Sequence, residues 1–440
     1  MNSTVDVVSR EGIPGYIDDA VNFLKAVPWP YYLVVSYGFL IPVRALHLPG
    51  VGGVGAADVL MPVGAFVLLA IRRTGQLQVP HLALTFFSFA AVISLLQINE
   101  LKPAVDCFIR WVRLFGIFIP FYFALFIPVD NRMTRVAFMT WMLGGLVAIL
   151  IGMFLYWFQI EVRGGQQRLW MNGGSMIRAG GLIGNSGAFG HLTSTWAVVC
   201  VTWMMSVCQH RYRIVGVIFV VMCTMYVIYI SSSRAALLHL ASASIVFLVL
   251  YEMPEKIRHW LPLLLGAGLA LAVLMYCTNQ WGGQFGDSGR KSSAIESSLA
   301  RFIPGFGGAS VEEFTSNRSD NWPEYIAMMN EKALTGWGYK MGVRLHEESP
   351  DNSYLSVLLE TGAFGFIGMS MFIVSCLFIL GQGYFAKDPY CCVMIPVLSG
   401  QLVNCMTSDI YTFWITMPVV FMLLGIVTQR AAKKKLDATA

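Results

Sequence analysis

Long apolar runs dominate the chain and follow one another with short polar breaks. A helix needs about 20 mostly apolar residues to cross the hydrocarbon core of a bilayer. The pattern therefore predicts an all-α polytopic membrane protein with about a dozen spanning helices. These are expected at residues 27–46, 56–71, 80–97, 107–128, 136–158, 188–208, 213–231, 234–252, 260–277, 353–381, 390–406 and 411–429.

Two polar segments between these runs are long enough to fold, and long loops often carry function. The first, near 159–188, is rich in glycine and arginine, and the second is a large hydrophilic loop at 278–352. Within the second, apolar residues recur with a period near 3.6 and predict a short amphipathic helix. They are Trp322, Tyr325, Ile326, Met329 and Leu334.

The large loop divides the chain into three parts. Residues 1–277 hold the first nine expected spans, and residues 353–440 hold the last three and a basic tail. Lys and Arg gather in the short loops on one side, for example Arg132 and Arg135, so these loops and both termini are expected in the cytoplasm. The large loop then faces the non-cytoplasmic side of the membrane.

Composition agrees with a membrane protein and excludes a water-soluble one. The chain is 56% hydrophobic and only 12% charged, with a mean hydropathy of +0.63, whereas soluble domains are about 25% charged. The net charge of +5 includes no basic block longer than Lys433–Lys435, so no nucleic-acid partner is expected. The tail is better interpreted as an anchor near anionic membrane lipids.

Two arginines stand beside expected spans at the non-cytoplasmic face. Arg178 lies in RAGGLIGNSG before one span, and Arg234 lies in SSSRAALL between two others. Each could simply reach the interface or cap a helix. However, the flanking Gly and Ser residues leave backbone N–H groups open, and guanidinium groups match phosphate oxygens. An anionic ligand bound from outside is the sharper interpretation.

The large loop ends in SPDNSYLSVLLETGAFGFIG. Asp351 and Asn352 enter the tenth expected span, and Tyr354 follows close behind. One interpretation is only structural, because Asp, Asn and Ser are preferred helix N-caps. The other is that these polar groups serve a reaction at the membrane surface.

Further candidates lie earlier in this loop. Arg318 and Trp322 precede the turn-rich ALTGWGYKMG, which places Trp337 between two glycines. Such rings can stack on sugars, but loop aromatics more often pack the loop's own small core. His346 and the other histidines have no metal-ligand spacing, so neither a metal nor another cofactor is expected.

Taken in order, these motifs resemble the O-antigen polymerase and O-antigen ligase superfamily of bacterial envelope enzymes. The family's loop carries an Arg, a Trp four residues on, a G-x-G turn, and a His-Asn-x-Tyr-Leu segment with a downstream Glu and Gly. The resemblance covers about half of the chain, roughly 175–370, and is specific as an ordered set.

The resemblance implies a GT-C-like, metal-independent glycosyltransferase of the bacterial inner membrane with a periplasmic active site. Such an enzyme moves a glycan from undecaprenyl diphosphate to a sugar hydroxyl. Arg178, Arg234 and Arg318 would bind the diphosphate. Asn352, Tyr354, Trp337 and Trp322 would position substrate. Such polymerases can also work with a chain-length regulator protein.

One departure from the family pattern bears on the activity. Ligases have a His before the Asn, whereas here Asp351 precedes Asn352 and the nearest histidine is His346. Either could accept the proton of an attacking hydroxyl. The departure favours a polymerase of polysaccharide repeat units over an O-antigen ligase that transfers polymer to a lipid A core. A lipid-linked oligosaccharide flippase or transporter is a third alternative, although no inverted repeat supports it.

Overall fold

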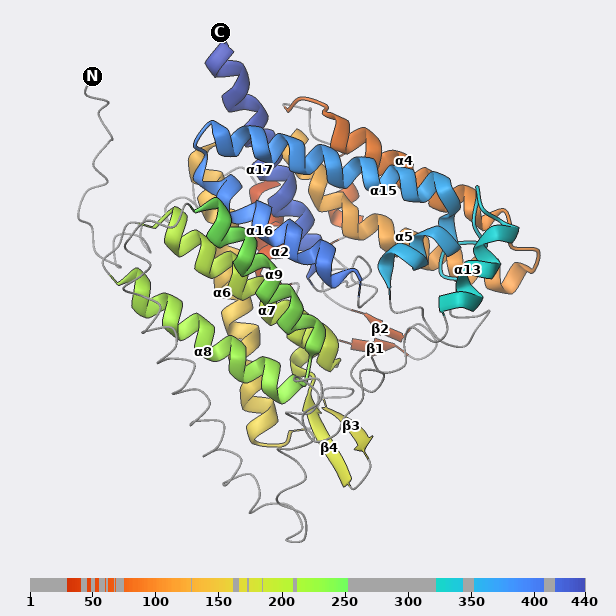
Figure 1. The fold of residues 1–440 in the computed structure, drawn as a ribbon, viewed down its shortest axis with the longest axis horizontal. Coiled ribbons are helices and arrows are strands. Elements are labelled where there is room, and N and C mark those ends of the chain that lie inside the picture. Colours follow the sequence, from red (N-terminus) through yellow and green to blue (C-terminus); the bar gives the residue numbers. More distant parts are fainter. Residues whose placement is uncertain are drawn as a thin grey trace.

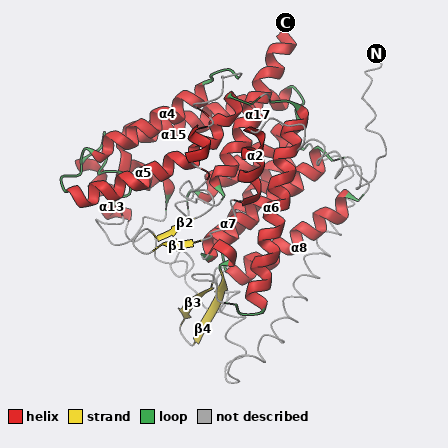
Figure 2. Cartoon of the chain, turned by 180° about the vertical axis from the view of Figure 1, so that it is seen from behind, coloured by secondary structure: helices red, strands yellow, loops and turns green. Residues whose placement is uncertain are grey.

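A computed structural model of the chain describes a helical bundle with two small β-hairpins (Figures 1 and 2). Within the described residues, four helices are long and apolar enough to cross a membrane, which makes this an α-helical membrane protein. The described residues are 30–40, 46–48, 52–54, 60, 62–66, 68, 75–127, 129–160, 166–171, 174–183, 185–208, 212–251, 322–342, 352–406 and 416–439.

Most of the predicted spans coincide with helices. The predicted span at 260–277 lies outside the described residues, and the count of twelve spans stays a prediction. The helices are α2 (Pro30–Leu40), α4 (Val79–Leu95), α5 (Leu101–Tyr122), α6 (Asn131–Trp157), α7 (Ser186–Ser206), α8 (Arg213–Ser231), α9 (Arg234–Leu250), α13 (Trp322–Glu331), α15 (Ser353–Phe385), α16 (Pro389–Asn404) and α17 (Met417–Thr439), with 3₁₀ turns η1 (Phe123–Leu125) and η2 (Gly181–Ile183).

The glycine-rich segment before α7 contains a hairpin that the apolar pattern did not predict. Strands β3 (Gln166–Met171) and β4 (Gly174–Ala179) pair antiparallel, with Gln167 opposite Arg178. A second hairpin joins β1 (Leu46–Leu48) to β2 (Gly52–Val54). Both lie between helices, and β4 delivers Arg178 to the start of α7.

The centre of the bundle is α17, whose residues 417–427 are almost all buried. It contacts α5, α6, α15 and α16. Close helix packing elsewhere depends on small residues, as is common in membranes. At Gly368 of α15, a Cβ atom would lie 2.9 Å from the backbone nitrogen of Phe87 in α4.

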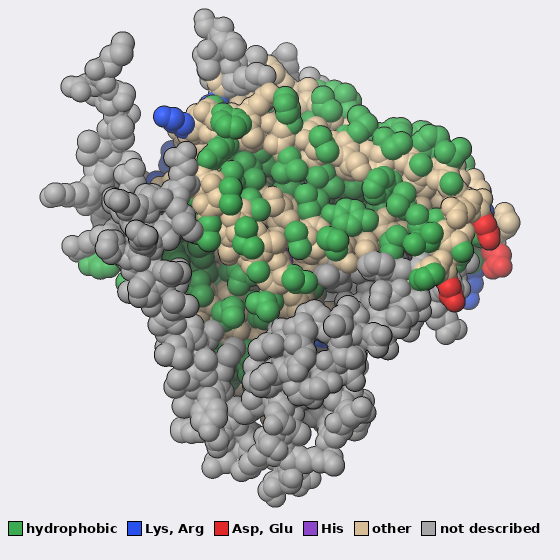
Figure 3. Space-filling model, in the orientation of Figure 1, with side chains coloured by type: hydrophobic (Ala, Val, Ile, Leu, Met, Phe, Trp, Pro, Cys, Tyr) green, Lys and Arg blue, Asp and Glu red, His purple; other side chains and the backbone are tan. Residues whose placement is uncertain are grey.

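A broad apolar surface runs along the helices (Figure 3). Large side chains on it are exposed, including Phe89, Val374 and Phe378 at 60%, 65% and 64%. Charged side chains gather at the end of the molecule that carries α13 (Figure 3), where Glu324 and Glu331 are exposed. An apolar band of this kind is expected for a surface that faces lipid.

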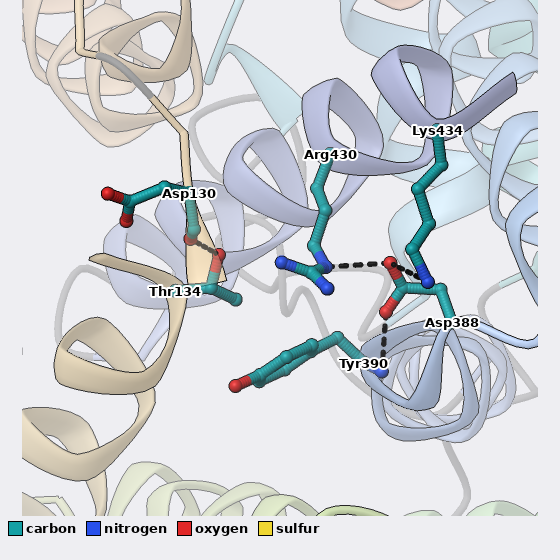
Figure 4. Close-up of polar contacts among 6 residues, drawn as sticks. All are labelled: Asp130, Thr134, Asp388, Tyr390, Arg430 and Lys434. Carbon is teal, nitrogen blue, oxygen red and sulfur yellow. Dashed lines mark hydrogen bonds and ion pairs between the residues drawn. The ribbon is translucent and has the colours of Figure 1, made fainter. Parts of the chain in front are cut away.

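The opposite end holds a buried ion pair (Figure 4). Asp388 caps α16 by accepting from the backbone N–H of Tyr390 at 3.1 Å. Its carboxylate lies 2.6 Å from Nε of Arg430 and 3.5 Å from Nζ of Lys434, both on α17. The Arg430 guanidinium also lies over the Tyr390 ring, 4.8 Å from its centroid. Lys387 and the start of the basic tail lie at this same end of the bundle. Basic residues of the short loops are expected to gather on one side of the membrane in this way.

The helix α13 forms within the predicted amphipathic segment, but its apolar residues do not share one buried face. Tyr325 is buried, whereas Ile326 and Leu334 are 48% and 62% exposed. Leu334 lies beyond the end of α13, in the turn that follows it. What holds this part of the loop is backbone hydrogen bonding to α15, described below.

Candidate functional site

Arg178 clamps the turn that leads into Arg234. The helix α8 ends at Ser231, Ser232 adopts a left-handed conformation with φ of 49°, and α9 begins at Arg234. Nε of Arg178 donates to the carbonyl of Ser231 at 2.8 Å, and Nη2 donates to the carbonyl of Ser232 at 3.1 Å. Two arginines from separate predicted motifs therefore meet at one turn, which we call the arginine turn (Ser231–Arg234).

Two helices start beside the arginine turn. Ser233 caps α9, and Asn185 caps α7 by accepting from the backbone N–H of Ala188 at 3.0 Å. Gly190 of α7 lies so close to the turn that a Cβ atom would approach the Cβ of Ser233 to 2.4 Å. Helix N-termini carry partial positive charge, and both arginines are only partly buried, so this region favours an anion.

The start of α15 forms a second part of the site. The side-chain oxygen of Asn352 accepts from the backbone N–H groups of Tyr354 at 3.0 Å and Leu355 at 3.2 Å, so the N-cap interpretation is correct for Asn352. The N–H of Ser353 donates to the carbonyl of Cys405 at 2.8 Å. The hydroxyl of Tyr354 donates to the carbonyl of Leu402 at 2.8 Å. The start of α15 is thus fixed to the end of α16.

The GWGY turn is inserted into a break in α15, which the apolar run had predicted as an uninterrupted helix. Gly362 has φ of 66° and ψ of −165°, far from helical values. The loop supplies the hydrogen bonds that the break removes. Two bonds run from the loop to α15: the N–H of Trp337 donates to the carbonyl of Leu359 at 2.9 Å, and the N–H of Gly338 donates to that of Glu360 at 3.0 Å. Two run from α15 to the loop: the N–H of Ala363 donates to the carbonyl of Ala333 at 2.8 Å, and the N–H of Phe364 donates to that of Leu334 at 3.3 Å.

Two glycines make this crossing possible. A Cβ atom on Gly336 would lie 2.5 Å from the carbonyl carbon of Glu360, and one on Gly362 would lie 2.4 Å from that of Leu334. Both glycines have positive φ, which disfavours any side chain. We call this arrangement the loop crossing (residues 333–338 with 359–364). It brings the GWGY motif of the loop into direct contact with the TGAFG motif of α15.

Trp337 packs within the loop. Its Nε1 donates to the carbonyl of Met328 at 2.8 Å, and Nζ of Lys332 lies 4.3 Å from its ring centroid. This is the packing role that loop aromatics commonly have. A further role in positioning substrate stays a prediction.

The remaining predicted residues are placed only in part. Asp351, His346 and Arg318 lie outside the described residues. Trp322 begins α13, but its side chain is likewise outside the description. The structure therefore brings Arg178 to Arg234 and fixes Asn352 and Tyr354 at the end of α16.

Sequence reasoning missed a buried polar group that links these two parts. Nε2 of His191 in α7 lies 2.7 Å from Oε1 of Gln401 in α16, and Nε2 of Gln401 donates to Oγ1 of Thr195 at 3.0 Å. All three side chains are at most 3% exposed. A polar side chain inside an apolar span, such as Gln401 in the run 390–406, is the signal that could have found them.

Fold and site together define a helical membrane protein with an anion-favouring arginine turn at one end of its bundle. Residues 217–370 match the Wzy_C family model, described as O-antigen ligase. The match supports the assignment to the O-antigen polymerase and ligase superfamily that the motifs predicted. It spans Arg234, the loop crossing and the start of α15, whereas Arg178 and Gln401 lie beyond it. None of the curated proteins compared with the chain matches it.

Proposed function

We propose that the protein polymerises polysaccharide repeat units at the periplasmic face of the bacterial inner membrane. The donor is a glycan on undecaprenyl diphosphate, and the acceptor is a sugar hydroxyl of another lipid-linked repeat. The observation that carries the proposal is the pair of hydrogen bonds from Arg178 to the arginine turn. They place Arg178 against Ser231 and Ser232, shortly before Arg234 and within the part of the chain that the O-antigen ligase family model matches.

The chemistry needs charge stabilisation at the leaving group. The acceptor oxygen forms a bond to the anomeric carbon while the bond from that carbon to the diphosphate oxygen breaks, and the diphosphate leaves with the electron pair. Fixed guanidinium groups and helix N-termini stabilise the negative charge that develops there. Arg178 and Arg234 take this role in the proposal, with Arg318 as a third contributor, so no metal ion is required.

The proton of the acceptor hydroxyl must go to a base. Asp351 immediately precedes Asn352, the residue that caps α15, and His346 is the alternative. An Asp here in place of the family's His supports a polymerase over a ligase. In the proposal, the cap by Asn352 and the bond from Tyr354 to α16 hold this part of the chain in place.

The direct test is elongation by the purified protein. Incubation with a synthetic undecaprenyl-diphosphate repeat unit should give a ladder of longer lipid-linked glycans. Arg234→Ala should lower the turnover about 100-fold or more, as loss of a donor to developing charge does in other enzymes. The matched control is Arg213→Ala, because Arg213 is likewise the first residue of its helix, α8. Normal elongation by Arg234→Ala would refute the assignment.

The name of the matched family makes the ligase a second candidate. A strain lacking the protein separates the two. Loss of a polymerase should leave single repeats on lipid A, whereas loss of a ligase should leave none there while lipid-linked polymer accumulates. The second result would replace the polymerase with the ligase.

A further inference from the structure

The buried polar side chains of His191, Thr195 and Gln401, here called the polar joint, connect the two parts of the candidate site. His191 and Thr195 lie one turn apart on α7, and Gln401 reaches both from α16. Because the Gln401 amide donates to Thr195, its oxygen faces His191, whose Nε2 then acts as the donor. These hydrogen bonds cross directly between α7 and α16.

On the α7 side, the joint continues directly into the arginine turn. His191 follows Gly190, the residue whose close approach to Ser233 leaves no room for a side chain. The helix α9 packs against both α7 and α16 near the polar joint. Nδ1 of His239 lies 3.0 Å from Oγ of Ser194, and a Cβ atom on Gly400 of α16 would lie 2.6 Å from Cδ2 of His239.

On the α16 side, the joint continues into the start of α15. The residue after Gln401 is Leu402, whose carbonyl accepts from Tyr354. Cys405, one turn further on, accepts from the N–H of Ser353. A continuous route of described hydrogen bonds and close contacts from the arginine turn to Asn352 therefore passes through the polar joint.

Apolar helices can slide or rotate against each other with little change in buried area, whereas a buried hydrogen-bonded pair fits only one register. We propose that the polar joint fixes the register of α7 against α16, and so sets the position of the arginine turn relative to the start of α15. Its residues are positioning residues and do not touch substrate. This inference rests on the proposed function, because it assigns donor binding to one part and acceptor activation to the other.

The decisive variant is Gln401→Met, which keeps the length of the side chain and removes both hydrogen bonds. Turnover of the lipid-linked repeat should fall about tenfold or more, because a misplacement near 1 Å can cost about 100-fold. Binding of undecaprenyl diphosphate should stay within about twofold, because the arginine turn itself is intact. Both are measured on the full-length protein in lipid nanodiscs and normalised to folded protein.

Two further variants separate positioning from general stability. Gln401→Glu keeps an acceptor for His191 and a partner for Thr195, so it should recover turnover to within about threefold of the native protein. Thr202→Val is the matched control, since the hydroxyl of this buried α7 residue donates only within its own helix, to the carbonyls of Val198 and Val199. It should leave turnover unchanged. Where Gln401→Met yields no folded protein, Thr195→Val removes one of the two bonds and takes its place.

A distance measurement tests the joint without relying on activity. The helices α6 and α7 are closely packed, since a Cβ atom on Gly152 would lie 2.4 Å from the Phe189 ring. Spin labels on unnatural amino acids at Ile160 and Met406, exposed residues after α6 and α16, therefore report on α7 against α16. Gln401→Met should shift or broaden the distance distribution, and Thr202→Val should not.

An unchanged distribution, an unchanged turnover, or a loss of undecaprenyl-diphosphate binding equal to the loss of turnover would overturn the inference. If the native protein elongates nothing, the proposed function fails instead. The distance distributions then still decide whether the joint fixes the register of the two helices.

Discussion

Arg178 makes two hydrogen bonds to successive carbonyls, a task that suits the planar fork of a guanidinium group. A lysine in its place keeps the charge but presents a single ammonium group. Its position on β4 also shows why the glycine-rich segment matters: the hairpin brings a distant part of the chain to the end of α8. The predicted anion site thus depends on a contact that no local pattern in the sequence reveals.

Arg178→Lys should therefore lower both the stability of the protein and its rate of elongation. We expect a loss of about 1.5–3 kcal/mol in unfolding free energy, typical for a hydrogen bond to a charged group, together with a clear fall in elongation. Thermal unfolding in detergent and the elongation assay measure the two effects. Arg213→Lys, at the opposite end of α8, is the control and should change neither. An Arg178→Lys protein of native stability would contradict the clamp.

Asp388 offers a residue-scale test that is independent of the site. Its carboxylate is fully buried, and Arg430 is only 10% exposed. Asp388→Asn keeps an oxygen that can cap α16 but leaves the Arg430 charge without its partner, so we expect a loss of about 3–5 kcal/mol in stability. The double variant with Arg430→Met should lose less than the sum of the single variants. Turnover per folded molecule should be unchanged, because this pair lies at the end of the bundle opposite the site.

At the scale of the helices and strands, the loop crossing is the feature with the clearest mutational consequence. The carbonyls and N–H groups freed by the break at Gly362 would otherwise be unsatisfied in an apolar environment, which is costly. Residues 333–338 satisfy them. The crossing is therefore a packing requirement for α15 as much as a feature of the loop.

Gly362→Ala should prevent normal folding. An alanine there meets both an unfavourable φ of 66° and backbone atoms 2.4 Å from its Cβ, and backbone strain alone costs about 1–3 kcal/mol. Gly381→Ala is a matched control in the same helix, because nothing lies within 4 Å of its would-be Cβ. It should be neutral or stabilising by up to about 1 kcal/mol. Yields of folded protein by fluorescence-detected size-exclusion chromatography compare the two, and equal yields would contradict the crossing.

Local patterns predicted the helices well and their interruptions poorly. The span predicted at 213–231 coincides with α8, because apolar runs and their basic flanks are local properties. The break in α15 was missed, since glycines are common in membrane helices and the atoms that stabilise the break come from the loop. The bond between His191 and Gln401 joins residues 210 positions apart, which no periodicity could reveal.

At the scale of the whole molecule, the two ends of the bundle differ in chemistry. One end carries Lys387, the Asp388 pair and the basic tail, and the other carries both hairpins, α13 and the arginine turn (Figure 1). That the predicted site residues share one face of the membrane stays a prediction.

The basic end should face the cytoplasm. A green fluorescent protein fused after residue 440 should fluoresce, and alkaline phosphatase at the same position should be inactive. Fusions after Ile160 should behave in the opposite way, because α6 ends there on the side of the hairpins. Reversed reporters would place the arginine turn in the cytoplasm and remove the proposed periplasmic reaction.

The loop crossing also limits how this protein can be divided for study. A fragment of residues 278–352 produced in water would lack the α15 carbonyls and N–H groups with which its GWGY turn pairs. Antibodies raised against such a peptide, or crystals grown from it, would report a conformation unlike the native one. Useful truncations must keep the hydrophilic segment and the membrane helix that follows it in one polypeptide.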